Sequence, residues 1–315
     1  MAGSLITGIG GFIGSSIARA LLDRGERVRG VDNFSTGKRH NLTGILDRIE
    51  LIETDILDLN AMKSACAGMD CVFHEAAVPS VPKSVADPLA SNRANVDGTL
   101  NVLVAARDAK VRRVIYAASS SAYGDTPTLP KHEGMAPDPI SPYAVAKLAS
   151  EQYMISFYRC YGLETVSLRY FNVFGPRQDP TSPYSGVLAK FITQMLRGET
   201  PTIFGDGTQS RDFTYIDNAV SANLLAREAP APEAAGKVFN VATGRRIDLN
   251  EVFEALKRIT GYTGSVTYGP ERDGDIKHSL ADISRAGQAL GYRPTVDFDD
   301  GLRRTVTWYR EQMKS

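Results

Sequence analysis

A serine, a tyrosine and a lysine are the residues of this sequence best suited to proton and hydride chemistry. Tyr143 and Lys147 lie four residues apart on a helix predicted over 143–161, so both side chains emerge on the same face. Ser119 follows an apolar strand predicted over 114–118, at the carboxyl edge of a sheet. We expect the ammonium, together with a positively charged nicotinamide ring, to lower the pKa of the phenol.

A phenol tuned in this way can remove a hydroxyl proton while a hydride leaves the carbon for a nicotinamide. Ser119 would hydrogen-bond the same oxygen and position it. The Tyr-x-x-x-Lys spacing also occurs by chance on helices. The catalytic interpretation therefore depends on a cofactor site elsewhere in the chain.

Such a site is predicted at the start of the chain, where a glycine turn directly follows the apolar pair Leu5-Ile6. Gly8 and Gly11 can adopt backbone angles closed to other residues and allow the chain to approach a ligand closely. The helix predicted from Phe12 directs unpaired N–H groups and its positive dipole end at a diphosphate, and Gly14 allows tight packing of helix on strand. The order strand, glycine turn, helix predicts a dinucleotide site.

A second strand, over 28–32, ends in Asp32, about twenty residues beyond the glycine turn. A carboxylate at this place accepts hydrogen bonds from the adenosine ribose and repels a 2′-phosphate, which favours NAD over NADP. Lys38 and Arg39 lie close enough to weaken that preference. The alternative is that Asp32 only forms a turn at the strand end.

Composition excludes several classes of partner. The chain has 315 residues, is 43% hydrophobic, and carries 36 Lys and Arg against 36 Asp and Glu, so nothing indicates nucleic acid or an anionic membrane. We expect no membrane span and no signal peptide. The three cysteines lack metal-site spacing and the four histidines are scattered, so no metal is expected and a reducing cytoplasm fits.

The order of the predicted elements indicates an α/β fold, a doubly wound parallel sheet of Rossmann type with a smaller α+β lobe. We divide the chain into a dinucleotide-binding domain over 1–170 and a substrate lobe over 171–315, with 238–242 returning to the main sheet. Strands are predicted at 5–7, 28–32, 49–53, 71–74, 114–118 and 165–169. Helices are predicted near 12–23, 59–67, 88–109, 143–161, 185–197, 249–259, 282–290 and 299–313.

Over essentially its whole length the chain resembles the extended short-chain dehydrogenase/reductase family, and within it the nucleotide-sugar 4-epimerases. The segment 116–125 looks most like bacterial UDP-N-acetylglucosamine 4-epimerases. The resemblance is carried by Thr7-Gly8, Gly11, Gly14, Asp55-Ile56, His74-Glu75-Ala76-Ala77, Asn95, Ser119-Ser120-Ser121, Tyr143, Lys147, Arg169-Tyr170-Phe171-Asn172 and Arg211-Asp212-Phe213.

The resemblance implies a bound NAD that stays with the enzyme. Asp55 and Ile56 would hold the adenine, while Ala76, Ala77 and Asn95 would line the cofactor channel. The full set of implied cofactor residues is Gly8, Gly11, Phe12, Ile13, Gly14, Asp32, Asn33, Lys38, Asp55, Ile56, Ala76, Ala77, Asn95, Tyr143, Lys147 and Phe171.

It also implies a UDP-sugar substrate. Ser120 and Ser121 would face the sugar. Asn172 would contact the UDP diphosphate, and Arg211 and Arg272 would neutralise it. Asp275 would bind the uridine ribose, and Val187 is the remaining implied substrate residue. Alternatively, Arg211 forms a surface ion pair with Asp212, and Asp275 caps a loop. A small residue at Ser279, where related epimerases that exclude N-acetyl sugars carry tyrosine, would admit an acetamido group, unless Ser279 only caps a turn.

The implied reaction is reversible C4 epimerisation of UDP-hexoses through a 4-keto intermediate, on UDP-GlcNAc/UDP-GalNAc and on UDP-Glc/UDP-Gal. The run Ser120-Ser121-Ala122 replaces the Asp-Glu pair of dehydratases, but leaves open a UDP-glucuronate 4-epimerase or decarboxylase. A non-catalytic NAD-binding regulator would lack the serine, tyrosine or lysine. By analogy, we expect a homodimer formed through the helices over 88–109 and 143–161.

Overall fold

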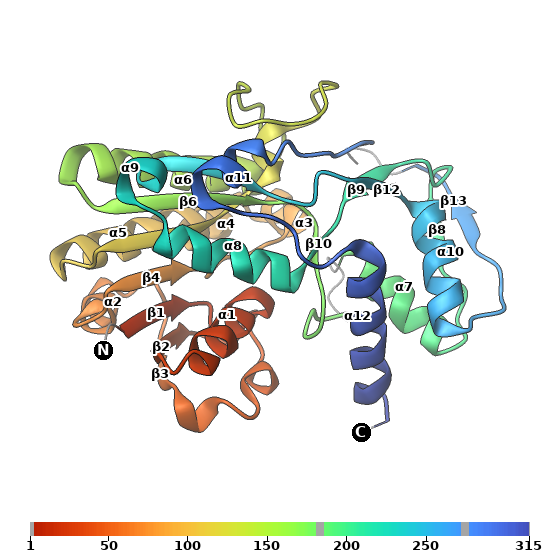
Figure 1. The fold of residues 1–315 in the computed structure, drawn as a ribbon, viewed down its shortest axis with the longest axis horizontal. Helices are drawn as coiled ribbons and strands as arrows, with labels where there is room; N and C mark the ends of the chain where they lie inside the picture. Colours follow the sequence, from red (N-terminus) through yellow and green to blue (C-terminus); the bar gives the residue numbers. More distant parts are fainter. Residues whose placement is uncertain (1–2, 181–185, 272–276, 315) are drawn as a thin grey trace.

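A seven-stranded sheet forms the centre of the computed structural model, which describes residues 3–180, 186–271 and 277–314 (Figure 1). All neighbouring strands of the sheet pair in parallel, in the order β11-β6-β5-β4-β1-β2-β3. The predicted doubly wound parallel sheet is confirmed. Its strands are β1 (Gly3–Thr7), β2 (Arg27–Asp32), β3 (Glu50–Glu53), β4 (Cys71–His74), β5 (Arg113–Ser119), β6 (Glu164–Tyr170) and β11 (Lys237–Val241).

Helices cover both faces of this sheet. One layer contains α1 and α8, which contact each other, and the other contains α2, α5 and α6, in which α5 contacts both α2 and α6. Strands buried on both faces read as continuous apolar runs, and every residue of β1 and β4 is buried. The helices are α1 (Phe12–Asp23), α2 (Leu59–Cys66), α3 (Val81–Ala86), α4 (Pro88–Asn92), α5 (Gly98–Asp108), α6 (Pro142–Tyr161), α8 (Ile216–Glu228), α9 (Ala231–Ala234) and α11 (Ser284–Leu290).

The strand order reverses between β1 and β4, which places the loops after these two strands side by side. Ligands of open α/β sheets bind at such a switch point, beyond the carboxyl ends of the strands. The glycine turn after β1 and the segment after β4 therefore meet where a ligand is expected.

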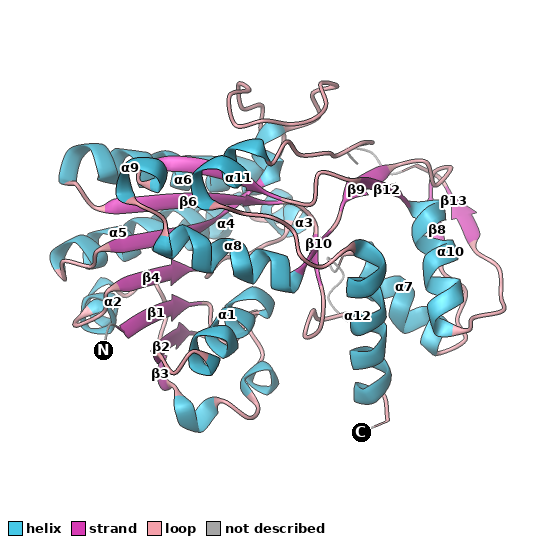
Figure 2. Ribbon diagram, in the orientation of Figure 1, coloured by secondary structure: helices cyan, strands magenta, loops and turns pink. Residues whose placement is uncertain are grey.

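A smaller lobe lies beside the sheet and, in the described residues, contains three two-stranded sheets and three helices (Figure 2). Its aromatic core brings together Phe174, Phe213, Tyr215 and Phe298. Because β11 comes from the second half of the chain and pairs with β6, the two halves share one sheet. The lobe contains β7 (Val173–Phe174), β8 (Thr202–Phe204), β9 (Ser210–Asp212), β10 (Thr214–Tyr215), β12 (Arg246–Asp248), β13 (Thr267–Gly269), α7 (Val187–Leu196), α10 (Leu249–Thr260) and α12 (Phe298–Gln312).

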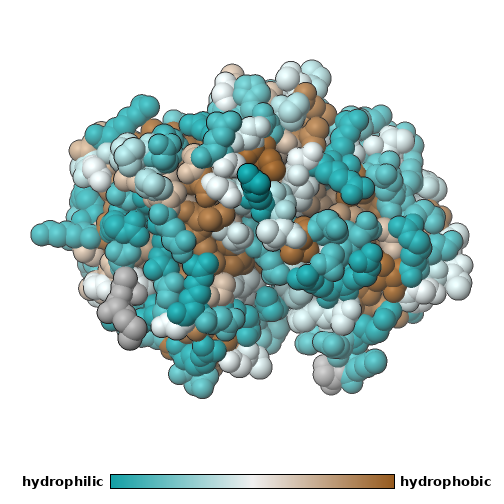
Figure 3. Space-filling model, in the orientation of Figure 1, coloured by the Kyte–Doolittle hydropathy of each residue, from teal (hydrophilic) through white to brown (hydrophobic). Residues whose placement is uncertain are grey.

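One face of the molecule carries mainly hydrophilic side chains, with smaller apolar areas between them. Figure 3 shows mostly hydrophilic side chains on the face seen in Figure 1, with a notch at the lower edge where the two lobes separate. None of the helices in the described ranges is long and apolar enough to cross a bilayer.

The helix predicted over 88–109 is interrupted. It consists of α4, a π-helical turn over Arg93–Asp97 and α5. At the end of this turn Gly98 packs so closely on Ile56 that an added Cβ would lie 2.5 Å from the Ile56 side chain. The turn therefore brings the helix against the loop that carries Asp55 and Ile56.

Candidate cofactor and active site

A cavity of about 500 Å³ opens at the carboxyl edge of the sheet. Its walls come from the glycine turn, the ends of β2, β4 and β5, the first turns of α6 and a second-lobe segment that includes Asn172, Val173 and Arg177. Most of the predicted cofactor residues line it, namely Gly8, Gly11, Phe12, Ile13, Gly14, Asp32, Asn33, Lys38, Asp55, Ile56, Ala76, Ala77, Tyr143 and Lys147.

The glycine turn is a cradle made of backbone. Gly8 has φ +72°, and an added Cβ would lie 2.7 Å from the amide nitrogen of Ala76 after β4. An added Cβ at Gly14 would lie 2.3 Å from the Gly8 carbonyl oxygen. Because α1 begins after Gly11, which has no side chain to cap the helix, its first N–H groups are free to meet a ligand. This cradle fits a dinucleotide diphosphate.

Asp32 both shapes the adjacent turn and lines the cavity. Its Oδ2 accepts a hydrogen bond from the Gly10 amide at 2.8 Å, and its Oδ1 accepts one from the Phe34 amide at 2.7 Å. Burial raises the pKa of this carboxyl, while the two backbone donors oppose the rise. Asp32 therefore both forms the turn and lines the cavity.

Two predicted cofactor residues lie behind the cavity wall. Asn95 is buried, and its side-chain oxygen accepts a hydrogen bond from the Val78 amide at 3.0 Å. Phe171 is fully buried and packs on Tyr123, with ring centroids 6.1 Å apart. In this structure both residues support the wall from outside the cavity.

The predicted catalytic residues meet in the cavity. Ser119 ends β5, and Tyr143 and Lys147 occupy the first turns of α6, which is capped by the Ser141 side chain accepting from the Ala144 amide at 3.2 Å. Lys147 Nζ donates to the Ala117 carbonyl at 2.7 Å. This bond fixes the ammonium against β5, two residues before Ser119.

Electrostatics around Tyr143 differ from the expectation. Burial raises the pKa of Tyr143 to about 12, and a hydrogen bond with Ser119 opposes the rise. The protein groups alone therefore do not produce the lowered pKa predicted from the sequence, because desolvation outweighs the serine and Lys147 is turned toward a carbonyl. Burial also lowers the pKa of Lys147 to about 8.

A second cavity, of about 250 Å³, extends the first into the smaller lobe. The two share the lining residues Asn172, Val173, Gln178 and Gly186, so they adjoin each other there. Predicted substrate residues Val187 and Arg211 line the second cavity. Together the two cavities therefore run from the glycine turn, past the catalytic residues, into the second lobe.

Arg211 is positioned by backbone carbonyls rather than by Asp212. Its Nη1 donates to Ser210 at 3.0 Å and to Lys277 at 3.1 Å. The Asp212 carboxylate is fully buried and accepts from the Thr243 and Gly244 amides. Arg211 and Asp212 therefore do not form the surface ion pair considered as an alternative, because the Asp212 carboxylate points inward.

Ser120, Ser121 and Ser279 lie outside the two cavity linings. The Ser121 hydroxyl donates to Ser119 Oγ at 2.8 Å, and Ser120 stands between them in the chain. The Ser279 amide donates to the Ser210 carbonyl at 3.0 Å. Arg272 and Asp275 fall outside the described residues.

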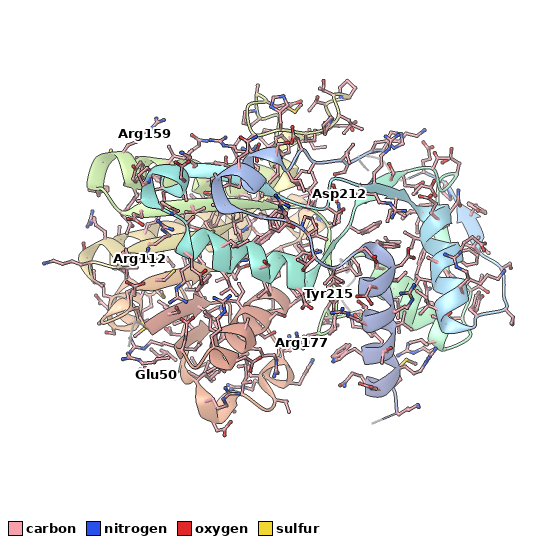
Figure 4. All side chains as sticks on the ribbon, in the orientation of Figure 1. Glu50, Arg112, Arg159, Arg177, Asp212 and Tyr215 are labelled. Atoms are coloured by element: carbon pink, nitrogen blue, oxygen red, sulfur yellow. The ribbon has the colours of Figure 1, made fainter. Side chains whose placement is uncertain are left out.

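Several cavity residues had no predicted role. Glu75 and Tyr170 line the catalytic end, and Arg177 and Gln178 line the side toward the second lobe. Arg177 has φ +72° and donates to Ser16 Oγ at 3.1 Å, and Figure 4 shows it between α1 and α12. Glu75 belongs to the motif His74-Glu75-Ala76-Ala77, and this motif could have indicated its place in the cavity. No sequence motif indicates Arg177, whose position depends on the fold.

Comparison with known proteins places these features in a family. The model of the NAD dependent epimerase/dehydratase family matches residues 4–242. UDP-glucose 4-epimerase of Mycolicibacterium smegmatis is 37% identical over 313 residues, covering 98% of this chain and 99% of that protein.

Solved structures agree over nearly the whole chain. UDP-glucose 4-epimerase of Thermotoga maritima with UDP-glucose superposes with a TM-score of 0.94 at 40% identity, covering 99% of both chains. UDP-N-acetylglucosamine 4-epimerase of Methanobrevibacter ruminantium M1 in complex with UDP-N-acetylmuramic acid gives 0.94 at 43% identity, with the same coverage. With its glycine cradle and its Ser-Tyr-Lys cavity, this chain belongs to the NAD dependent epimerase/dehydratase family.

Proposed function

We propose that the protein interconverts UDP-hexoses at C4, acting on UDP-GlcNAc/UDP-GalNAc and on UDP-Glc/UDP-Gal. The observation that carries this proposal is a pair of adjoining cavities. The first contains the dinucleotide cradle and the Ser119-Tyr143-Lys147 group, and the second reaches into the smaller lobe. The similar structures from Thermotoga and Methanobrevibacter carry UDP-glucose and UDP-N-acetylmuramic acid, which supports a UDP-linked sugar as the substrate.

The cofactor residues of the first cavity would hold NAD, which when bound supplies a reversible acceptor for the hydride of C4. Tyr143 takes the proton of the 4-hydroxyl and later returns a proton to the same oxygen on the other face of the sugar. Ser119 hydrogen-bonds this oxygen. The positive charges of the bound nicotinamide ring and of Lys147 together would offset the burial that raises the pKa of Tyr143. The 4-keto sugar turns about its link to UDP between the two steps.

This reaction needs a strong grip on UDP and a loose grip on the sugar. We assign the grip on UDP to Asn172, Val187 and Arg211, which line the second cavity. The family resemblance adds Arg272 and Asp275, which fall outside the described residues. A guanidinium suits this task because it makes paired, charged hydrogen bonds to a diphosphate.

We assign acceptance of N-acetyl sugars to the small side chain of Ser279, whose amide is bonded to the Ser210 carbonyl at 3.0 Å. Replacing Ser279 by tyrosine should depress activity on UDP-N-acetylglucosamine far more than activity on UDP-glucose. Ser265→Tyr, at an exposed loop position of the same lobe, serves as the control. Equal losses on both sugars in the Ser279 variant would remove this assignment.

The direct test of the reaction incubates the protein separately with UDP-glucose, UDP-N-acetylglucosamine and UDP-glucuronate, followed by chromatography of the products. Epimers of the first two, without net reduction of NAD, are the expected result. Conversion of UDP-glucuronate alone, to an epimer or to a decarboxylated sugar, would replace the proposal by the related activity. An unchanged set of sugars would favour a non-catalytic NAD-binding protein.

We propose a homodimer formed through the helices over 88–109 and 143–161, which are α4, α5 and α6, with α3 packed against α4 and α6. Large apolar side chains are exposed on these helices, with Val85 65%, Leu89 76% and Val145 52% accessible. Sedimentation of the purified protein should give twice the chain mass, and Leu89→Glu should shift it toward the monomer. A monomeric parent protein would contradict the assignment.

A further inference from the structure

Two cations, Lys38 and Arg39, follow Asp32 in the chain, close to the part of the cavity expected to hold the adenosine ribose. A free cation at this place would bind the 2′-phosphate of NADP and so weaken the preference for NAD that the carboxylate sets. The structure places a carboxylate against each of the two cations.

The Arg39 guanidinium is held beside the cavity. It forms an ion pair with Glu53 at the end of β3, and its Cζ lies 4.3 Å from the centroid of the Phe34 ring. Neither Arg39 nor Glu53 belongs to the lining of the first cavity. A carboxylate and an aromatic ring therefore occupy this cation outside the cavity.

Lys38 lines the cavity and is paired with a carboxylate of the smaller lobe. Its amide donates to the Gly10 carbonyl at 2.8 Å, and the Gly10 amide donates to Asp32 Oδ2 at 2.8 Å. The preceding residue packs on the same carboxylate, since an added Cβ at Gly37 would lie 2.8 Å from Asp32 Oδ2. The Lys38 Nζ atom lies 3.7 Å from Asp179 Oδ2, and Asp179 also lines the cavity.

We propose that Asp179 is a specificity-determining residue that excludes NADP, because it neutralises Lys38 beside the Asp32 carboxylate. The proposal rests on the dinucleotide site of the proposed function. Asp179 occupies the cation that would otherwise bind a 2′-phosphate, and its own charge repels the phosphate. Its backbone is held against the larger lobe, because Arg177, two residues earlier, donates to Ser16 Oγ of α1 at 3.1 Å.

The exposure of the pair sets the size of the effect. The Lys38 side chain is 47% accessible and the Asp179 side chain 32%, so water weakens the interaction of both with a phosphate. In water, two unit charges about 4 Å apart change an affinity about fivefold. Loss of the carboxylate both removes a repulsion and frees the lysine, so the change should be at least about fivefold.

Asp179→Asn tests the proposal, because it removes the charge and keeps the size of the side chain. Titration of cofactor-stripped protein with NAD and with NADP gives the ratio of the two dissociation constants. The ratio of Kd for NADP to Kd for NAD should fall at least about fivefold in this variant, and by less at high salt, which screens exposed charges. Glu254→Gln removes an exposed charge of α10 in the same lobe and should keep the ratio of the parent.

A double variant assigns the gain to the lysine. Lys38→Gln with Asp179→Asn leaves no freed cation, so the ratio should return close to that of the parent. An unchanged ratio in Asp179→Asn, a gain that persists in full in the double variant, or a parent that binds NADP as tightly as NAD would overturn the proposal. A parent that binds NAD selectively but epimerises no UDP-sugar would instead overturn the proposed function, because the ratio does not depend on turnover.

Discussion

Replacing Gly8 by alanine probes the dinucleotide cradle, and Gly25→Ala is its matched control. Both glycines have left-handed backbones, with φ +72° at Gly8 and +74° at Gly25. An alanine in this conformation costs about 1–2 kcal/mol, so Gly25→Ala should lose about that much free energy of unfolding and Gly8→Ala should lose more, because of its added contact. An added Cβ at Gly25 meets nothing within 4 Å, whereas at Gly8 it meets the Ala76 amide at 2.7 Å.

Ordinary contact begins near 3.4 Å, so in Gly8→Ala the glycine turn and the segment after β4 must separate by at least 0.7 Å, which is 3.4 minus 2.7. This separation displaces the backbone groups that would face the diphosphate. We expect NAD affinity to fall at least tenfold, which is about 1.4 kcal/mol. Gly25→Ala should bind NAD like the parent.

The assay combines urea unfolding with NAD titration of protein stripped of cofactor, and measures the NAD retained after desalting. If Gly8→Ala holds NAD as tightly as Gly25→Ala, the backbone cradle is not the cofactor site. If Gly8→Ala loses NAD affinity but keeps the free energy of unfolding of the parent, the left-handed backbone at Gly8 does not strain an alanine.

Three other perturbations have defined outcomes. Tyr143→Phe should still bind NAD and UDP but turn over about a hundredfold or more slowly in steady-state assays; near-parent turnover would exclude its acid–base role. Glu151→Gln breaks the buried ion pair with Arg169 (2.7 Å) and should lower the free energy of unfolding by about 3 kcal/mol. Arg304→Gln breaks the exposed ion pair with Asp300 and should lower it by less than about 1 kcal/mol. Equal losses in the two variants would refute this. Because the pKa of His74 is lowered from 6.5 to about 3, its unfolded form binds the extra proton as pH falls below 6.5. Stability should then decrease by about 1.4 kcal/mol per pH unit more in the parent than in His74→Gln, measured by urea unfolding from pH 6 to 4; parallel slopes would contradict this.

Local patterns predicted the elements that carry their own signal. The helix predicted over 12–23 matches α1, because its glycine turn and its apolar face, including Ile17 and Leu21, are adjacent in sequence. The strand predicted over 71–74 matches β4. The catalytic residues could be grouped from the sequence because Tyr143 and Lys147 share a helix face and Ser119 ends a strand.

Features that depend on the fold were missed. The helix α8 was not predicted because its buried face includes Asn218 and Asn223, which weaken its hydrophobic periodicity. Asn218 accepts from the Val296 amide at 3.1 Å, a contact 78 residues away in the chain. The raised pKa of Tyr143 depends on burial, which no local pattern reveals. The hydrogen bond from Tyr170 to Glu75 at 2.9 Å joins residues 95 positions apart and depends on strand order.

We infer that the hydrogen on C4 leaves the sugar and returns to the same carbon without exchange with solvent. Turnover of UDP-glucose deuterated at C4, followed by mass spectrometry and NMR of the product, tests it most directly. We expect UDP-galactose that keeps the deuterium at C4, with no net accumulation of NADH. Replacement of the label by solvent hydrogen, or no epimer at all, would contradict it.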